Sequence, residues 1–190
     1  MTPTIPSLAG IVRFLRGRLA RCIRDERGVS AVEFALLLPL MVTLYLGGVE
    51  VSQGLTIDRK VTLVARTVTD LAAQVSSITN ADMTNILNAS TAVMLPYSMA
   101  QVKVTISQVT IDGDGKATIA WSDTKNGTAR ANGSAVTLPP ALNVPNSSLI
   151  WGEVSYTYKP VIGYVITGTM NLTDKIYMRP RLSDSVTRTS

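Results

Sequence analysis

The stretch that decides this fold is VSAVEFALLLPLMVTLYLGGV, which covers residues 29–49. It is 21 residues long, and a helix needs about 20 mostly apolar residues to cross the hydrocarbon core of a bilayer. One carboxylate, Glu33, lies inside it. A charge in that position costs about 2.5 kcal/mol or more, so it is a functional-site hypothesis by default. The sequence therefore predicts a lipid-embedded helix over residues 29–50 with a functional glutamate near its start.

The positive charge of the chain lies before this stretch. The net charge is +5, of which residues 1–28 carry +4 and the remainder +1. Basic residues on the N-terminal side of a span keep that end in the cytoplasm, so we predict a cytoplasmic leader over residues 1–28 and an extracytoplasmic domain over residues 79–190. The nearly neutral remainder argues against nucleic acid as a partner. The leader arginines are Arg13, Arg16, Arg18, Arg21, Arg24 and Arg27.

The apolar run differs from the core of an ordinary secretory signal peptide. No small-residue cleavage site follows it, because Gly47 and Gly48 lead directly into Glu50. A cut that keeps the helix must lie before the run, and Gly28 marks the boundary between charged and apolar sequence. We therefore predict cleavage between Gly28 and Val29, which places a new α-amine near Glu33.

The composition argues against enzymes. Histidine is absent, which removes Ser-His-Asp and Cys-His catalysis and most zinc sites. The single cysteine, Cys22, lies in the leader and has no second thiol for a disulfide. We predict no catalytic residues, no cofactor and no metal site. Carboxylates without a recognisable catalytic pairing are Asp112, Asp114, Asp123, Glu153 and Asp174.

Beyond the apolar run, hydrophobic residues recur with helical spacing. They predict a continuous helix over residues 31–75, with residues 51–78 as an amphipathic continuation into the domain. The stripe packs either on the chain's own domain, which is the commoner case, or on neighbouring subunits. Pro39 predicts a kink, which is either a tolerated irregularity or an aid to side-by-side helix packing. The stripe consists of Val51, Leu55, Val61, Val64, Val68, Leu71 and Val75.

The remainder reads as a short helix followed by strands. A helix is predicted over residues 81–95, capped by Asn80 or Thr79 and ended by Pro96. Asp112-Gly-Asp-Gly115 is interpreted as a hairpin turn rather than a calcium loop, which needs further ligands. The elements predict an α+β fold in which the long helix packs on a small antiparallel sheet. Alternating residues predict strands at 102–107, 117–121, 153–160 and 176–181, with loops over 124–148 and 160–174.

Two blocks carry a family resemblance. Residues 24–39, RDERGVSAVEFALLLP, resemble the start of TadE-like and TadG-like proteins of tight-adherence (Flp-type) pilus systems. Residues 154–160 and 177–181, VSYTYKP and YMRPR, are similar to the close of those domains. The first block is the more specific, because charge, glycine, a glutamate five residues later and an apolar run must coincide.

The resemblance implies a pilin-like minor pilin or pseudopilin in a bacterial inner membrane. It implies a prepilin peptidase that cuts between Gly28 and Val29, a Glu33 that guides processing or assembly, and pilus subunits and Tad-type assembly proteins as partners. The large domain favours a minor, initiating or tip component over a bulk filament subunit. The alternative is an uncleaved single-span protein that tethers an extracytoplasmic binding domain, with Glu33 snorkelling to the interface.

Overall fold

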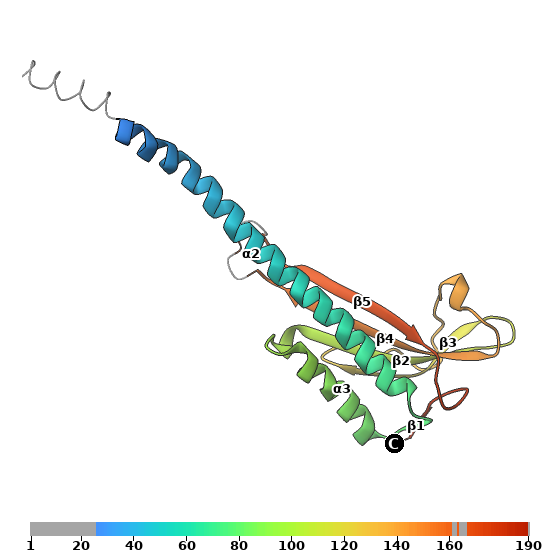
Figure 1. Cartoon of the computed structure of the whole chain (residues 1–190). Helices are drawn as coiled ribbons and strands as arrows, with labels where there is room; N and C mark the ends of the chain where they lie inside the picture. Colours follow the sequence, from blue (N-terminus) through green and yellow to red (C-terminus); the bar gives the residue numbers. More distant parts are fainter. Residues whose placement is uncertain (1–25, 161–162, 164–166, 190) are drawn as a thin grey trace, which may run out of the picture. The chain divides into compact units, whose positions relative to one another are not determined.

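The structure begins with one long helix, α2 (Glu26–Ala73), shown in Figure 1. It is a computed structural model that describes residues 26–160, 163 and 167–189. The helix continues through Pro39, whose carbonyl accepts a hydrogen bond from the Thr43 hydroxyl at 2.8 Å. Leu, Ala, Met and Glu, which favour helix, make up much of its sequence. The predicted long helix is confirmed.

Helix α2 ends earlier than the pattern predicted. It stops at Ala73, whose carbonyl accepts a hydrogen bond from the Arg181 amide at 2.9 Å. Strand β1 (Ser77–Ile78) follows and pairs in parallel with β6 (Thr187–Arg188). The predicted helical continuation to residue 78 therefore fails over its last residues, because their backbone groups bond to a segment that is distant in sequence.

The second helix, α3 (Asn80–Met94), has the predicted position and cap. The Thr79 hydroxyl accepts a hydrogen bond from the Asp82 amide, and the Asp82 carboxylate accepts one from the Thr79 amide at 3.0 Å. This reciprocal capping box satisfies two backbone donors that a helix start otherwise leaves open. These hydrogen bonds lower the pKa of Asp82, the side-chain bond to Thr79 more than the backbone bond.

A four-stranded sheet has the order β3-β2-β4-β5, with all neighbours antiparallel. The Asp112 turn joins β2 to β3 as predicted, with the Gly115 amide bonded to the Asp112 carbonyl at 3.1 Å. Gly115 has φ +79°, which favours glycine. The strands are β2 (Val102–Ile111), β3 (Ala117–Lys125), β4 (Ser147–Tyr158) and β5 (Met170–Met178), with short 3-10 turns η1 (Met99–Gln101) and η2 (Pro140–Leu142).

Strand β5 is longer than the sequence indicated. Residues 170–174 were predicted as loop, yet the strand pairs with β4 from Met170 to Met178 without interruption. Leu172 and Ile176 face the core. Asp174 lies between them in the same row, so apolar and polar residues do not alternate regularly along the strand sequence. The loop prediction for these residues is therefore wrong, whereas the α+β fold class is confirmed.

One face of the sheet packs against the second half of α2 and against α3 (Figure 1). Val61, Val64 and Val68 of α2 are fully buried in a cluster with Val104 and Ile150 of the sheet. The predicted packing of this stripe on the chain's own domain is confirmed for these residues.

The helix lies close to β4. A Cβ atom at Gly152 would lie 1.8 Å from the Thr69 hydroxyl oxygen, so only glycine fits there. Two members of the predicted stripe, Val51 and Leu55, are instead 48% and 55% exposed, because Glu50, Gly54 and Ile57 form the row that faces the domain on that part of the helix.

The outer face of the sheet has a smaller cluster of its own. Val109, Ile119, Leu149 and Trp151 are buried there beneath Leu138, which comes from the connection between β3 and β4. The long loop predicted over residues 124–148 thus exists from residue 126 to 146, but it covers apolar surface.

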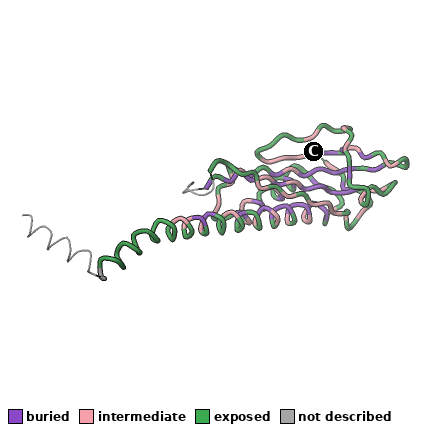
Figure 2. Tube along the Cα trace, turned by 90° about the horizontal axis from the view of Figure 1, so that it is seen from above, coloured by how far each residue is buried: buried purple, intermediate pink, exposed green. Residues whose placement is uncertain are grey.

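The chain divides into two units, residues 1–48 and 49–190. Within the first, residues 28–42 are exposed on every side of the helix, as the green run in Figure 2 shows. Among the described helices, α2 contains the one candidate membrane span, with a mean hydropathy of 2.0 over an 18-residue window. Within the second unit, α2 is buried on one side only.

Candidate functional site

The predicted processing and assembly residues lie on the exposed part of α2. Gly28, Val29 and Glu33 are all solvent-exposed, and a Cβ at Gly28 would meet no atom within 4 Å. Val29 and Glu33 are four residues apart, so their side chains lie on one face of the helix, a turn from each other. The structure thus brings the predicted new N-terminus and the glutamate together on one surface.

The predicted topology arginines are outside what the structure can place. Arg13, Arg16, Arg18, Arg21 and Arg24 precede the described residues, as does Cys22, and of Arg27 only the backbone, within α2, is described. Their role remains a prediction from sequence. Pro39, by contrast, is described: it lies inside helix α2, which continues on both sides of it. The predicted kink stays a prediction.

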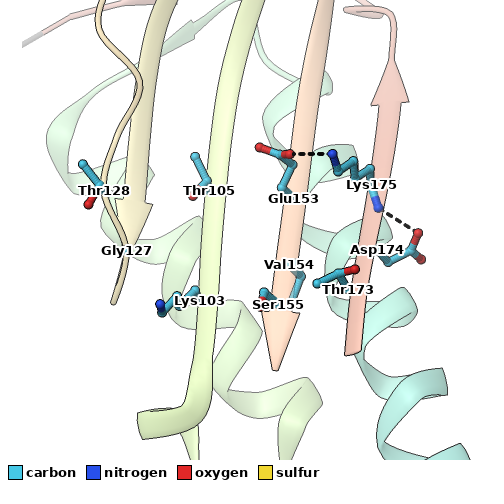
Figure 3. Close-up of a pocket in the computed structure, with 10 residues that line it drawn as sticks. All are labelled: Lys103, Thr105, Gly127, Thr128, Glu153, Val154, Ser155, Thr173, Asp174 and Lys175. Carbon is cyan, nitrogen blue, oxygen red and sulfur yellow. Dashed lines mark hydrogen bonds and ion pairs between the residues drawn. The ribbon is translucent and has the colours of Figure 1, made fainter. Parts of the chain in front are cut away.

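A second candidate site, the outer groove, lies on the open part of the sheet's outer face (Figure 3). It has a volume of about 280 Å³ and is lined mostly by hydroxyls and charges. Glu153 forms ion pairs with Arg130 and with Lys175, the latter at 3.6 Å. The lining residues are Lys103, Thr105, Gly127, Thr128, Glu153, Val154, Ser155, Thr173, Asp174 and Lys175.

Arg130, the ion-pair partner of the groove residue Glu153, also contacts an aromatic pair. Its guanidinium carbon lies 3.8 Å from the centre of the Trp151 ring, and Trp151 stacks on Tyr177 at 5.4 Å between centres. Burial, followed by the Glu153 charge, raises the pKa of Tyr177. The sequence pointed to none of this, because Arg130 stands in an Asn/Gly/Ser-rich stretch that predicts only a variable loop.

A third feature, the apolar groove, lies on the helix-covered side of the domain. It has a volume of about 380 Å³ and is bounded by α2 and by the start of β5. The exposed Val51 and Leu55, which the helical stripe predicted as packed, form part of its wall. The lining residues are Val51, Gly54, Leu55, Asp58, Tyr158, Met170 and Leu172.

A second glutamate near the apolar run was missed by the sequence interpretation. Glu50 is 1% exposed, and its backbone carbonyl accepts a hydrogen bond from the Tyr158 hydroxyl at 3.3 Å. Burial raises the pKa of Tyr158, and the Glu50 charge raises it further. The last residue of the predicted span is thus a residue that the domain buries. A carboxylate directly after an apolar run was the available signal.

Two further carboxylates, Asp112 and Asp123, have structural partners. Asp112 Oδ1 accepts hydrogen bonds from the Asp114 and Lys116 amides at 3.1 and 2.8 Å, which holds the turn. Asp123 binds the Arg188 guanidinium through two hydrogen bonds, at 2.9 and 3.2 Å. Within the described ranges, no three His, Cys, Asp or Glu side chains are grouped so that they could hold a metal ion.

Comparison with known proteins gives one match. Residues 28–70 match the model of a family described as TadE-like protein. The matched segment starts at the predicted cleavage residue and contains Glu33, so the resemblance predicted from residues 24–39 is confirmed. No curated protein and no solved structure matches the chain.

Proposed function

We propose that this protein is a minor pilin or pseudopilin of a tight-adherence (Flp-type) pilus system. The observation that carries the proposal is the TadE-like match, which covers a helix whose first part is apolar and exposed all round and holds one carboxylate. TadE-like proteins are pilus-associated structural proteins, so the proposed role is in assembly, adhesion or secretion rather than catalysis. Residues 29–50 lie in the inner membrane in this proposal, and the domain lies in the periplasm or outside.

Processing is the first step of the proposed function. A prepilin peptidase removes residues 1–28 by cutting after Gly28, where the exposed helix offers a position without a side chain. The cut leaves Val29 as the new N-terminus and removes the leader arginines together with Cys22. What remains is a span whose one acidic side chain within residues 29–49 is Glu33.

Glu33 then acts in assembly. In the low dielectric of a bilayer a carboxylate and an amine interact far more strongly than in water, and an unpaired charge there is costly. The Val29 amine of a neighbouring mature subunit neutralises Glu33 in this proposal, which fixes the axial register between subunits. Pilus subunits and Tad-type assembly proteins are the corresponding partners, with lipid around the exposed apolar side chains.

The processing experiment is intact mass analysis of the protein isolated from its native membrane. The proposal expects a species that begins at Val29 and does not react with thiol reagents, because Cys22 is gone. Gly28→Leu should retain the leader. A wild-type protein that keeps residues 1–28 would instead support the uncleaved tether.

The assembly experiment compares Glu33→Ala and Glu33→Gln with Thr43→Ala, which removes a polar group from the same helix without removing a charge. Crosslinking to pilus-system partners and surface adhesion are measured at matched membrane abundance. Both Glu33 variants should insert but lose crosslinking if the charge matters, whereas Thr43→Ala should behave as wild type. Undiminished crosslinking and adhesion in both Glu33 variants would contradict the role in assembly.

A further inference from the structure

The two edges of the sheet differ in how their backbone groups are used. The outer edge of β3 is covered, because its Ala117 carbonyl accepts a hydrogen bond from the Val136 amide at 3.0 Å and its Ile119 amide donates one to the Ser134 carbonyl at 3.0 Å. Strand β5 ends the sheet on the other side, and within the described residues it pairs only with β4. It contains no proline and its register has no bulge.

The open edge carries a row of backbone groups that point away from β4. The Lys175 amide donates to Asp174 Oδ1 at 2.7 Å, and Figure 3 shows this bond on the side of β5 opposite β4. Backbone groups alternate in direction along an antiparallel strand. The amides and carbonyls of Asn171, Thr173 and Tyr177 therefore point outward as well, toward the space where another strand would add.

The two grooves described above flank this edge on opposite faces of the sheet. The apolar groove reaches β5 at Met170 and Leu172, and the outer groove reaches it at Thr173 and Lys175. Side chains of an added strand alternate between the faces. Those on the helix-covered face would enter the apolar groove, and those on the outer face would meet the Lys175 side chain, which is 61% exposed.

A second copy of this chain fits the edge poorly. Antiparallel pairing of two β5 strands points the two α2 helices in opposite directions, whereas copies inserted in one membrane leave it with the same polarity. Parallel pairing inverts the faces, so that the row of Leu172 and Ile176 would adjoin the partner's row of Thr173 and Lys175. The antiparallel arrangement thus conflicts with anchoring of both copies in one membrane, and the parallel arrangement conflicts with the pattern of apolar and polar side chains.

We propose that β5 is a docking edge for an extended segment of a different protein, which adds as a further strand. The segment has apolar residues at alternate positions, facing the apolar groove, and polar or acidic residues between them, facing Lys175. Backbone hydrogen bonds supply the contact and the two grooves select the side chains. The argument against a second copy rests on the proposed membrane function. The observations of the open edge and of the two grooves do not depend on it.

The test uses the full chain in detergent and two fluorescent nine-residue peptides of equal composition. One alternates Val with Glu and Thr, and the other groups the valines at one end. The alternating peptide should bind more tightly than the grouped one. Thr173→Pro, which removes one outward amide, should weaken binding about tenfold, whereas Thr173→Ala, which keeps the amide and removes only the side chain, should weaken it less than Thr173→Pro.

A second variant keeps the test decisive if Thr173→Pro unfolds the domain. Lys175→Glu should weaken binding of the alternating acidic peptide about fivefold and strengthen binding of its Lys-for-Glu counterpart. Equal binding of the alternating and grouped peptides, no response to either variant, or a β5-mediated dimer of the full chain would overturn the proposal. Peptide binding does not depend on processing or on Glu33, so its failure is distinguishable from failure of the proposed function.

Discussion

Two parts of one helix, residues 28–42 and residues 57–73 of α2, differ in composition and in surroundings. In the first, 11 of 15 residues are apolar and one is charged; in the second, 9 of 17 are apolar and five are charged. In the first part every side chain is exposed, including Leu36 and Phe34. In the second, most apolar residues lie on one side, where Val64 and Val68 are fully buried, and Leu63 is the exposed exception. The two parts therefore differ both in the number of apolar residues and in their distribution around the helix. The one-sided distribution marks the part that packs on protein.

The second part also approaches the sheet more closely than a hydrophobic stripe requires. Thr69 and Gly152 meet at a distance that excludes a Cβ atom, and the Thr69 hydroxyl donates to the Ala65 carbonyl at 2.6 Å. A polar residue on the buried side is satisfied within its own helix, so it can face the sheet at little cost. The Pro39 carbonyl in the first part accepts the same kind of bond from the Thr43 hydroxyl at 2.8 Å, but on an exposed stretch of the helix.

The largest effect should come from filling this close contact. Gly152→Ala should lower the free energy of unfolding by about 3 kcal/mol, because the new methyl group overlaps Thr69 and the helix must shift. Urea unfolding of the full chain in detergent, followed by tryptophan fluorescence, measures it. Gly54→Ala is the control: its new Cβ would lie 3.6 Å from the Tyr158 ring, an ordinary contact, and the domain should be unchanged or slightly stabilised.

Truncation to alanine in each of the two parts of α2 should sharpen the comparison. Val64→Ala should cost about 2 kcal/mol of unfolding free energy, since it leaves a cavity at a fully buried position. Leu37→Ala removes more carbon from an exposed position and should leave domain unfolding unchanged while it weakens partition into lipid vesicles. A loss of domain stability in Leu37→Ala as large as that in Val64→Ala would break the distinction.

Tyr158 should give a smaller effect with a distinctive pH dependence. Tyr158→Phe removes the hydroxyl bonded to the Glu50 carbonyl and should cost about 1 kcal/mol near pH 7. Burial and Glu50 raise the pKa of Tyr158 in the folded chain, so the stability linked to its proton is present below about pH 10 and is lost as the pH rises through the folded value.

Unfolding curves measured between pH 8 and pH 11 check this expectation. The wild-type chain should lose stability over that range more steeply than Tyr158→Phe. Identical alkaline limbs for the two proteins would show that Tyr158 ionisation is not linked to folding.

The smallest effect should come from the start of α3. Thr79→Ala should cost about 0.5 kcal/mol at neutral pH through the lost cap. The bond to Thr79 lowers the pKa of Asp82, so its contribution is present above the ordinary aspartate pKa and disappears as the pH falls through the lower, folded value. Acid unfolding curves should therefore be less steep below about pH 4 in Thr79→Ala, and unaltered curves would contradict the linkage.

The sequence was sufficient where one local pattern decides the structure. The span, the α3 cap and the Asp112 turn follow from apolar length, from Thr79 with Asp82 three residues later, and from Gly115. The TadE-like resemblance likewise rested on contiguous residues.

The sequence was insufficient where distant residues decide. Val51 and Leu55 fit the helical stripe, but the spacing did not show that Glu50, Gly54 and Ile57 form the row that faces the domain on that part of the helix. The start of β5 was predicted too late in the sequence, because Asp174 interrupts a row of apolar residues. Arg130, Trp151 and Glu153 come together only once the loop folds over the outer face, and the end of α2 depends on Arg181.

The parallel pair of β1 and β6 has a consequence for how the protein is made. A chain emerging N-terminus first from a ribosome or a translocation channel presents the Ile78 carbonyl long before Thr189 exists to donate to it at 3.0 Å. The Gln108 side chain is likewise made long before Val186, whose amide donates a hydrogen bond to Gln108 Oε1 at 2.8 Å. Closing so large a loop is entropically costly and therefore late. The four-stranded sheet can be complete before the last segment is made, so formation of the sheet and final closure of the domain occur as successive events.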